Sequence, residues 1–281
     1  MITRRHALGL PLGLLAAASI RTPARATVAP MKNVIQDSLS KHFADNGTEG
    51  TFVAYKVDDY TVIASDKDRS GEAMLPASTF KIPNSVIALE TGVVGDPDKD
   101  VFKWDGVERF IPEWNRDHTL RSAIADSATP VYQEIARRIG EERMQKYLTA
   151  FDYGNHDIGG GIDRFWLTGD LRIDPVQQVD FIDRLRRDAL PVSKRAQQLT
   201  RDILPVTKVG KATIRSKSGL IGVDDKTEGG SVRSSVGWLV GWVEKGSEQT
   251  VFALNLDIRE EHHRAARMKL AELCLTEIGA L

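Results

Sequence analysis

The run VGWLVGWV at residues 236–243 is rich in β-branched and aromatic side chains, which favour extended strands. TVFALNL at residues 250–256 and ATIRS at residues 212–216 have the same character. Near the other end of the chain, TFVAY at residues 51–55 and YTVIA at residues 60–64 are separated by a short turn-like segment, which predicts a hairpin. Strands at both chain ends predict one antiparallel sheet assembled from segments distant in sequence.

Helical spacing dominates the middle of the chain. The pair Asp174-Pro175 illustrates it, because a capping Asp and a Pro at the first helical position precede apolar residues at helical intervals. Residues 31–43 and residues 260–278 also have helical spacing, so we expect terminal helices to cover one face of the sheet.

The fold class that follows is α+β (α/β), with a single domain over residues 27–281. We assign about residues 27–75 and 205–281 to a sheet lobe, and about residues 76–204 to a mainly helical lobe. A cleft between two such lobes is a common place for a small-molecule site.

The first 26 residues have the pattern of an export signal. Arg4 and Arg5 precede the apolar run of residues 7–20, and Ala24-Arg25-Ala26 has the small-x-small pattern that signal peptidases cut. Thr3-Arg4-Arg5 also resembles a twin-arginine signal, so the Sec and Tat routes both stay open. Export predicts a periplasmic or secreted protein.

The composition of the 281-residue chain excludes two classes of partner. A formal net charge of −1 without a block of like charges predicts no binding to nucleic acid and no stable membrane association. Cys274 is the only cysteine, which excludes an internal disulfide, and its place in an apolar helix predicts a buried thiol. Whether the protein is a monomer or a homodimer stays open.

Ser78-Thr79-Phe80-Lys81 follows Pro76 and precedes apolar residues at helical spacing, so it is expected to open a helix. Side chains three positions apart share one helix face, which places the Lys81 amine beside the Ser78 hydroxyl. A serine hydroxyl becomes a good nucleophile when a neighbouring base removes its proton. By itself the motif is weak, because a capping serine and a solvated lysine would have the same spacing.

Two further motifs follow in a fixed order. Ser127-Ala128-Thr129 lies at a junction between polar and helical sequence, and Lys217-Ser218-Gly219 is expected to end the strand of residues 212–216. A cation at a strand end suits a substrate carboxylate, and a glycine lets the backbone approach it. The ordered set S-x-x-K, S-x-[NVT] and K-[ST]-G is the active-site set of penicillin-recognising serine enzymes.

Further residues give a sharper resemblance, to the class D (oxacillinase) serine β-lactamases. YGN at residues 153–155 and FWL at residues 165–167 look like the markers of that family. Other matches extend along nearly the whole mature chain, among them PASTFKIPNS at residues 76–85, KWDG at residues 103–106 and VYQ at residues 131–133. The resemblance implies a serine β-lactamase/transpeptidase-like fold and hydrolysis of the β-lactam ring of penicillin-type antibiotics, which confers resistance.

The resemblance also implies how the serine is activated. In class D enzymes the lysine of S-x-x-K reacts with carbon dioxide, so Lys81 is expected to be an N6-carboxylysine that acts as the base in both half-reactions. The enzyme then needs carbon dioxide or bicarbonate but no other cofactor and no metal. By the same resemblance, Trp166 donates its indole N–H to the carbamate, and Leu167 belongs to the apolar wall of the pocket.

Roles for the remaining site residues follow from the same family. The backbone N–H groups of Ser78 and Leu220 are expected to hold the oxyanion. Ser127 is expected to pass a proton to the departing lactam nitrogen, supported by the charge of Lys217.

One departure and one ambiguity accompany the match. The family usually has Val as the third residue of S-x-V, whereas this chain has Thr129. Its hydroxyl could hydrogen-bond the carbamate or admit extra water, so its effect on carbamate stability and deacylation stays open. For the substrate carboxylate, spacing favours Arg267, with Arg264 and Arg259 as alternatives.

Other functions remain as alternatives. A peptidoglycan D,D-peptidase, or penicillin-binding protein, shares the three motifs but has neither YGN nor FWL. A non-catalytic β-lactam sensor domain shares the fold but is tethered behind membrane helices, and none is predicted here. Zinc-dependent hydrolysis is disfavoured because no metal-ligand spacing relates the histidines, namely His42, His118, His156, His262 and His263.

Overall fold

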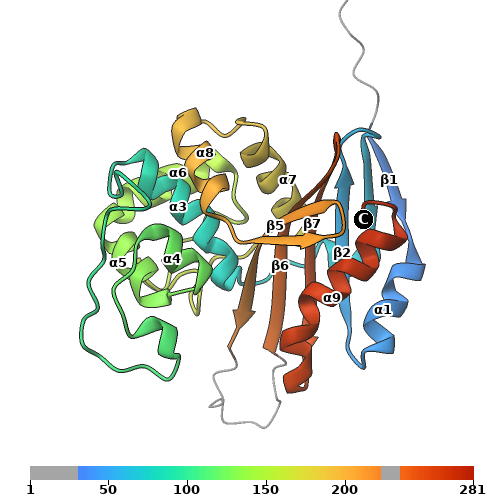
Figure 1. Ribbon diagram of the computed structural model, residues 1–281, viewed down its shortest axis with the longest axis horizontal. Coiled ribbons are helices and arrows are strands. Elements are labelled where there is room, and N and C mark those ends of the chain that lie inside the picture. The colour runs from blue at the N-terminus through green and yellow to red at the C-terminus, as the bar shows by residue number, and fades with distance from the viewer. Residues whose placement is uncertain (1–30, 223–234) are drawn as a thin grey trace, which may run out of the picture. The chain divides into compact units, whose positions relative to one another are not determined.

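Within residues 31–222 and 235–281, which the computed structural model describes, seven strands form one sheet in the order β1-β3-β2-β7-β6-β5-β4 (Figure 1). The predicted signal peptide lies outside the described residues. The strands are β1 (Lys32–Ile35), β2 (Gly50–Lys56), β3 (Thr61–Ala64), β4 (Val206–Val209), β5 (Ala212–Ile221), β6 (Ser235–Lys245) and β7 (Glu248–Ile258). Because β2 pairs with β7, segments from the two chain ends meet at the centre of the sheet, as predicted.

The N-terminal edge of the sheet differs from the prediction. Residues 31–43 do not form one helix, since β1 and a 3-10 turn, η1 (Asp37–Leu39), precede the short helix α1 (Ser40–Asp45). β1 pairs with β3 in parallel, so the sheet is mixed and the prediction of a wholly antiparallel sheet is wrong at this edge. All four residues of β1 are exposed, so no buried face enforces a helix, and the free edge of β3 offers backbone hydrogen bonds instead.

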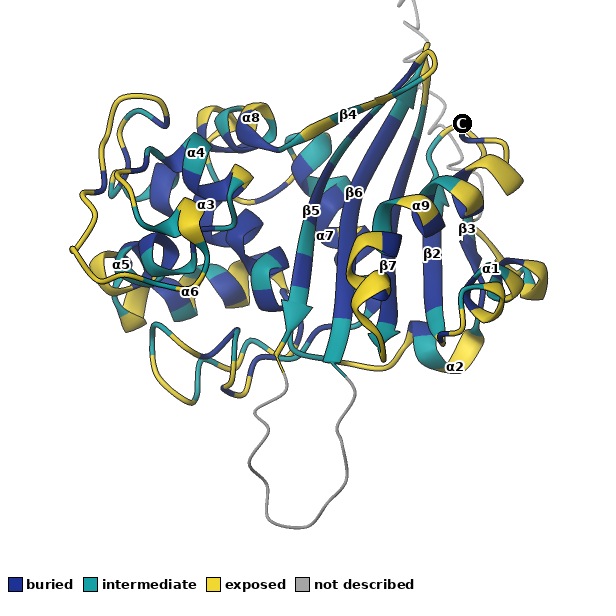
Figure 2. Cartoon of the chain, turned by 60° about the horizontal axis from the view of Figure 1, so that its bottom comes forward, coloured by how far each residue is buried: buried dark blue, intermediate teal, exposed yellow. Residues whose placement is uncertain are grey.

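The sheet is buried on both faces (Figure 2). On β6, Leu239 packs into the hydrophobic cluster that includes helix α9 (Glu261–Glu277), whereas its neighbours Trp238 and Val240 belong to the cluster of the opposite face. This alternation follows from the two-residue period of a strand. Helix α7 (Pro175–Arg186) covers that opposite face, so it packs on the sheet although its sequence lies within the predicted helical lobe.

The remaining helices form the mainly helical lobe that the sequence predicts (Figure 1). Its elements are α3 (Lys81–Glu90), η3 (Pro112–Trp114), α4 (Leu120–Ala125), α5 (Thr129–Ile139), α6 (Glu141–Phe151) and α8 (Lys194–Ile203). Two short elements lead into it, namely α2 (Lys67–Ser70) and the 3-10 turn η2 (Ala77–Phe80). The predicted cap of α7 is present, since the Asp174 carboxylate accepts the Gln177 backbone N–H at 2.7 Å.

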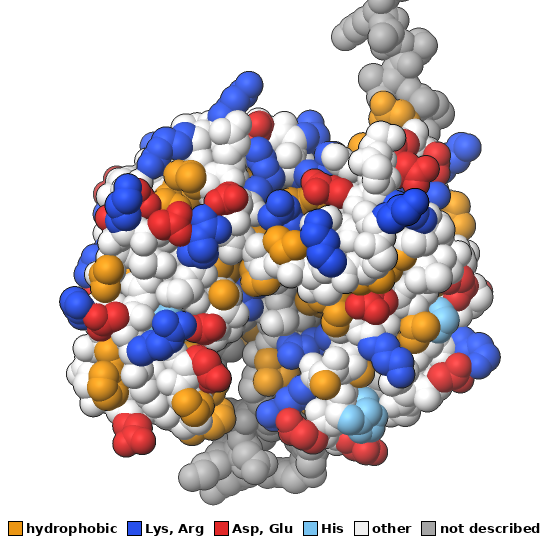
Figure 3. Space-filling model, viewed as in Figure 1, with side chains coloured by type: hydrophobic (Ala, Val, Ile, Leu, Met, Phe, Trp, Pro, Cys, Tyr) orange, Lys and Arg blue, Asp and Glu red, His pale blue; other side chains and the backbone are white. Residues whose placement is uncertain are grey.

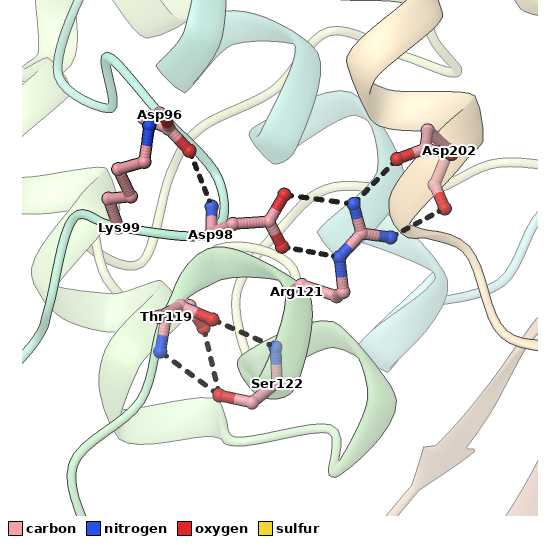
Figure 4. A network of polar contacts seen from close by, with 7 residues as sticks. All are labelled: Asp96, Asp98, Lys99, Thr119, Arg121, Ser122 and Asp202. Atoms are coloured by element: carbon pink, nitrogen blue, oxygen red, sulfur yellow. Dashed lines mark hydrogen bonds and ion pairs between the residues drawn. The ribbon is translucent and has the colours of Figure 1, made fainter.

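A polar network fixes α4 between its neighbours (Figure 4). Arg121 donates to the Asp98 carboxylate at 2.5 Å and to the Asp202 carboxylate, at the end of α8, also at 2.5 Å. The hydroxyls of Thr119 and Ser122 complete a capping box at the start of α4. Because the charged groups are partly exposed, each pair contributes at most about 1 kcal/mol, and the network serves mainly to orient the helix.

Charged side chains of both signs are interspersed over the face of the protein seen in Figure 3, as the net charge of −1 suggests. In the described part of the chain, no helix has both the length and the apolar character needed to cross a membrane.

The packing of α9 gives a stability prediction. Leu270 is fully buried between α9 and the sheet, whereas Leu273 on the same helix is 36% exposed. We expect Leu270→Ala to lower the free energy of unfolding by about 2–5 kcal/mol, because it leaves a cavity. Leu273→Ala, the control, is expected to cost less than about 1 kcal/mol. Urea denaturation measures both, and equal losses would contradict this packing.

Candidate active site

Ser78 and Lys81 lie where the 3-10 turn η2 runs into helix α3. The Lys81 amine donates a hydrogen bond to the Ser78 hydroxyl at 2.8 Å, the contact that the motif spacing predicts. Ser78 is partly exposed and Lys81 is completely buried. A substrate can therefore reach the hydroxyl, while the base behind it is shielded from bulk water.

The surroundings of Lys81 disfavour a charged amine. Its second hydrogen bond goes to the Thr129 hydroxyl at 3.2 Å, and its nitrogen lies 5.4 Å from the centre of the Tyr132 ring. Burial, with a smaller contribution from the positive charge of Lys217, holds the pKa of Lys81 well below that of a free lysine. The neutral amine, which has a lone pair, is thereby favoured.

The backbone just before the nucleophile is strained. Ala77 has a φ of +47°, in the left-handed region that alanine rarely adopts. Its N–H donates to the carbonyl oxygen of Trp166 at 3.0 Å, which helps to hold this conformation. Strained residues persist at functional sites only where the surrounding contacts fix them.

An aromatic cluster surrounds Phe80, the residue before Lys81. The Trp166 ring stacks on it at 5.3 Å between ring centres, and the rings of Phe165 and Tyr153 meet it edge-on at 4.9 and 5.8 Å. The YGN and FWL segments therefore pack together against the turn η2 (Ala77–Phe80), which carries Ser78 and is called the nucleophile turn below. The side chain of Asn155 bonds to the backbone of the following loop. Its amide N–H donates to the Asp170 carbonyl at 2.8 Å, and its amide oxygen accepts from the Arg172 N–H at 2.9 Å.

The indole N–H of Trp166 has no hydrogen-bond acceptor among the described residues, although the whole side chain is buried. A buried N–H without a partner costs about 1–3 kcal/mol. Such a group is explained when an acceptor joins the site, and the ring that carries it stacks on Phe80, the residue before Lys81. Leu167 is partly buried and packs against the hydrophobic core beside Trp166.

The Lys217-Ser218-Gly219 segment lies within β5, which continues to Ile221. The expectation that it ends the strand is therefore wrong, because the pairing of β5 with β6 extends through these residues to Ile221, with Gly219 opposite Trp238. A Cβ atom at Gly219 would lie 3.1 Å from both the Pro76 carbonyl oxygen and the Thr79 methyl group. The glycine thus lets β5 approach the nucleophile turn.

Two basic side chains lie at this part of β5, Lys217 on the strand itself and Arg267 on α9. The Lys217 side chain is only 3% exposed, and burial together with the charge of Arg267 lowers its pKa to about 7. Arg267 donates to the Gly219 carbonyl at 2.6 Å, and the lack of a side chain at Gly237 leaves room for it. Leu220, whose N–H is the second predicted oxyanion donor, pairs with the same Gly237.

The two alternative arginines are engaged elsewhere. Arg264 pairs with Glu261 at 3.6 Å, and Arg259 pairs with Glu49 at 2.9 Å. Arg267 has no carboxylate partner among the described residues, so the geometry favours the arginine that spacing had favoured.

The Ser127-Ala128-Thr129 segment reaches the site through its last residue. The Thr129 hydroxyl, which accepts from Lys81, also contacts the Ser127 carbonyl oxygen at 3.4 Å. Ser127 has a φ of +54°, so it is a second residue of the site motifs in the left-handed region, and its carbonyl oxygen, two positions before Thr129, is the part that contacts the Thr129 hydroxyl. The structure thus adds a direct contact between Thr129 and the lysine, which the motif alone does not define.

Several residues of the site are missed by sequence reasoning. Phe80, the centre of the aromatic cluster, occupies a variable position of the motif and gives no signal. Gln178 is a buried polar residue on the apolar side of α7, and its amide donates to the Thr79 hydroxyl at 2.9 Å. A glutamine within an otherwise apolar helix face is a signal that could have identified it.

Among the described residues, neither the cysteine nor a group of metal-ligating side chains belongs to this site. Cys274 is buried on the sheet-facing side of α9, as predicted, and burial raises the pKa of its thiol to about 12, so little reactive thiolate forms near neutral pH. Across residues 31–222 and 235–281, no group of three His, Cys, Asp or Glu side chains could hold a metal ion.

The site and the fold define a class of protein, the serine acyl-transfer enzymes that recognise penicillin. The family model of the penicillin-binding protein transpeptidase domain matches residues 41–275. β-Lactamase OXA-10 of Pseudomonas aeruginosa is 46% identical over 244 residues, which are 87% of this chain and 90% of that protein.

Solved structures agree. The class D β-lactamase YbXI from Nostoc superposes with a TM-score of 0.80 at 38% identity, over 86% of this chain and 99% of its own. FUS-1 (OXA-85), a class D β-lactamase from Fusobacterium nucleatum subsp. polymorphum, gives a TM-score of 0.81 at 33% identity, over 88% and 99% of the two chains. This chain belongs to the class D β-lactamases, serine hydrolases that act on the β-lactam ring.

Proposed function

We propose that this chain hydrolyses penicillin-type β-lactams through an acyl-enzyme on Ser78, and so confers resistance to them. The observation that carries the proposal is the 2.8 Å contact between the Lys81 amine and the Ser78 hydroxyl, with the lysine wholly buried. A group that accepts the hydroxyl proton must lie at such a distance.

Ser78 attacks the lactam carbonyl, and its proton leaves toward position 81. The backbone N–H groups of Ser78 and Leu220 stabilise the oxyanion, since Gly219 brings β5 against the nucleophile turn. The ring C–N bond breaks as Ser127 shuttles a proton to the lactam nitrogen, with electrostatic support from Lys217. Water then attacks the acyl-enzyme, which releases the opened product and restores the Ser78 hydroxyl. Arg267 binds the substrate carboxylate, because its guanidinium lies at Gly219 without a carboxylate of its own.

The residues around Lys81 fit a carbamate. Carbon dioxide bound to the Lys81 amine would supply a carboxylate base beside Ser78. The lowered pKa of Lys81 favours the neutral amine that such a reaction requires. The buried, unpartnered indole N–H of Trp166 is a suitable donor, and Leu167 with the aromatic cluster limits access of water.

We also propose that the protein is exported and acts in the periplasm or outside the cell, as a monomer or homodimer. The support is the sequence of residues 1–26, with paired arginines, an apolar run and an Ala-Arg-Ala exit. The D,D-peptidase and sensor alternatives are not favoured, because the relatives that match over most of the chain are named β-lactamases.

The first test follows turnover and acyl-enzyme mass with a chromogenic cephalosporin and with oxacillin, with and without added bicarbonate. Repeated turnover that rises with bicarbonate is expected. Lys81→Ala should lose both acylation and deacylation, by about 10³-fold or more, because general-base help is removed. A stoichiometric burst that leaves a stable adduct would instead indicate a peptidase or a sensor.

The second test concerns Trp166. Trp166→Phe keeps an aromatic ring but removes the N–H, so we expect a weaker carbamate signal in ¹³C NMR with labelled bicarbonate and a deacylation rate about 10- to 100-fold lower, as for one lost bond to a charged group. The control is Trp242→Phe, which also removes one N–H from a buried indole, one that bonds to Glu244. Equal signals in the two variants would contradict the assigned role.

The third test concerns Thr129, whose hydroxyl accepts from the free lysine amine. Thr129→Val removes this stabilisation of the unmodified lysine. We expect the bicarbonate concentration that gives half of the ¹³C carbamate signal to fall about 2- to 10-fold, the worth of one neutral hydrogen bond. Thr129→Ser keeps the hydroxyl and should match the unaltered protein. A rise in the value for the valine variant would reverse this interpretation.

A further inference from the structure

A buried amide lies behind the nucleophile turn. Gln178 on α7 is 1% exposed, and its side-chain N–H donates to the Thr79 hydroxyl at 2.9 Å. Thr79 is equally buried, and its hydroxyl donates in turn to the carbonyl oxygen of Pro76 at 2.7 Å. The chain of two hydrogen bonds thus links α7 to the segment that immediately precedes Ser78.

Thr79 touches the other side of the site as well. Its methyl group lies 3.1 Å from where a Cβ atom of Gly219 would be, so it packs directly against β5. Between Pro76 and Thr79 lies Ala77, whose φ of +47° is strained. The Thr79 hydroxyl accepts from Gln178 and donates to Pro76. These two hydrogen bonds therefore restrain both the strained turn and its distance from β5.

The helix that carries Gln178 is well placed for this purpose. α7 begins at a capping box between Asp174 and Gln177 and packs along the sheet on β7, β2 and β6. Burying a glutamine in such an apolar face costs free energy, because its amide loses its hydrogen bonds to water, unless hydrogen bonds within the protein replace them. Its amide donates to the one residue between Ser78 and Phe80.

We propose that Gln178 is a positioning residue for acylation: through Thr79 it holds the turn of Ser78 against β5, so that the hydroxyl and the oxyanion donors are in register. The proposal rests on acylation of Ser78, the proposed function. A displacement of about 1 Å at a reacting centre can cost about 100-fold in rate.

The test uses the full-length mature protein and a fluorescent penicillin in stopped flow, which separates the saturation constant from the limiting acylation rate. Gln178→Met keeps the length and removes the donor, and we expect its limiting rate to fall about 10- to 100-fold with a nearly unchanged saturation constant. The ¹³C carbamate signal should also be unchanged, because Gln178 does not act on Lys81.

A matched control is Gln197→Met. Gln197 is a fully buried glutamine on α8, and its side chain bonds to the backbone of Leu190 and Val192 instead of the nucleophile turn. It should lose stability without losing acylation rate. If the Gln178 variant acylates as fast as this control, the inference is overturned, and if the unaltered protein is not acylated at all, the proposed function fails instead.

A second pair of variants tests the same link from its other end. Thr79→Val should slow the limiting acylation rate about as much as Gln178→Met, and the double variant should be no slower than the slower single one, because both act through one chain of bonds. Thr79→Ser keeps the hydroxyl and should restore most of the rate. If Gln178→Met does not fold, equal rates for the valine and serine variants would overturn the proposal.

Discussion

The structure depends on a lysine amine that is withdrawn from water and has no carboxylate among the described residues to balance it. Lys81 contacts only hydroxyl oxygens and an aromatic ring, so an ammonium ion there would lack both solvent and counter-charge. The protein therefore favours the neutral amine, the form that can accept a proton or react with carbon dioxide. The Ser78 hydroxyl lies 2.8 Å from that amine, and the unpartnered indole of Trp166 stacks on Phe80, the residue before Lys81.

The architecture brings four distant segments to one short turn. The turn before α3 donates a backbone hydrogen bond to the Trp166 carbonyl and packs against the rings of Tyr153 and Phe165. It is also bonded by a buried amide of α7 and closely approached by β5 at Gly219. Gln178 and Gly219 come from α7 and β5, whereas Tyr153, Phe165 and Trp166 lie outside helices and strands and are held by burial in the hydrophobic core. Catalytic geometry on a strained backbone is thereby maintained by packing and not by local preference.

The sequence predicts much of this because the informative patterns are local or ordered. Strand periodicity near both ends of the chain indicates one sheet, and three spaced motifs indicate the site. Residues 31–43 are wrongly predicted because β1 is exposed and its strand state depends on the neighbouring β3. Spacing favours Arg267, but only the ion pairs of Arg259 and Arg264 distinguish it from these alternatives. Gln178 stands out as a polar residue, but no local pattern reveals that it bonds to Thr79, 99 positions away.

The central pairing of β2 with β7 has a kinetic consequence. The sheet cannot close until the last strands of the chain have met the first ones, so the closure entropy of a very long loop opposes its assembly. The nucleophile turn packs against β5, which is connected to β2 in the sheet only through β6 and β7. Activity should therefore emerge only with the final cooperative step of folding, and partly folded chains should be inert and open to proteases.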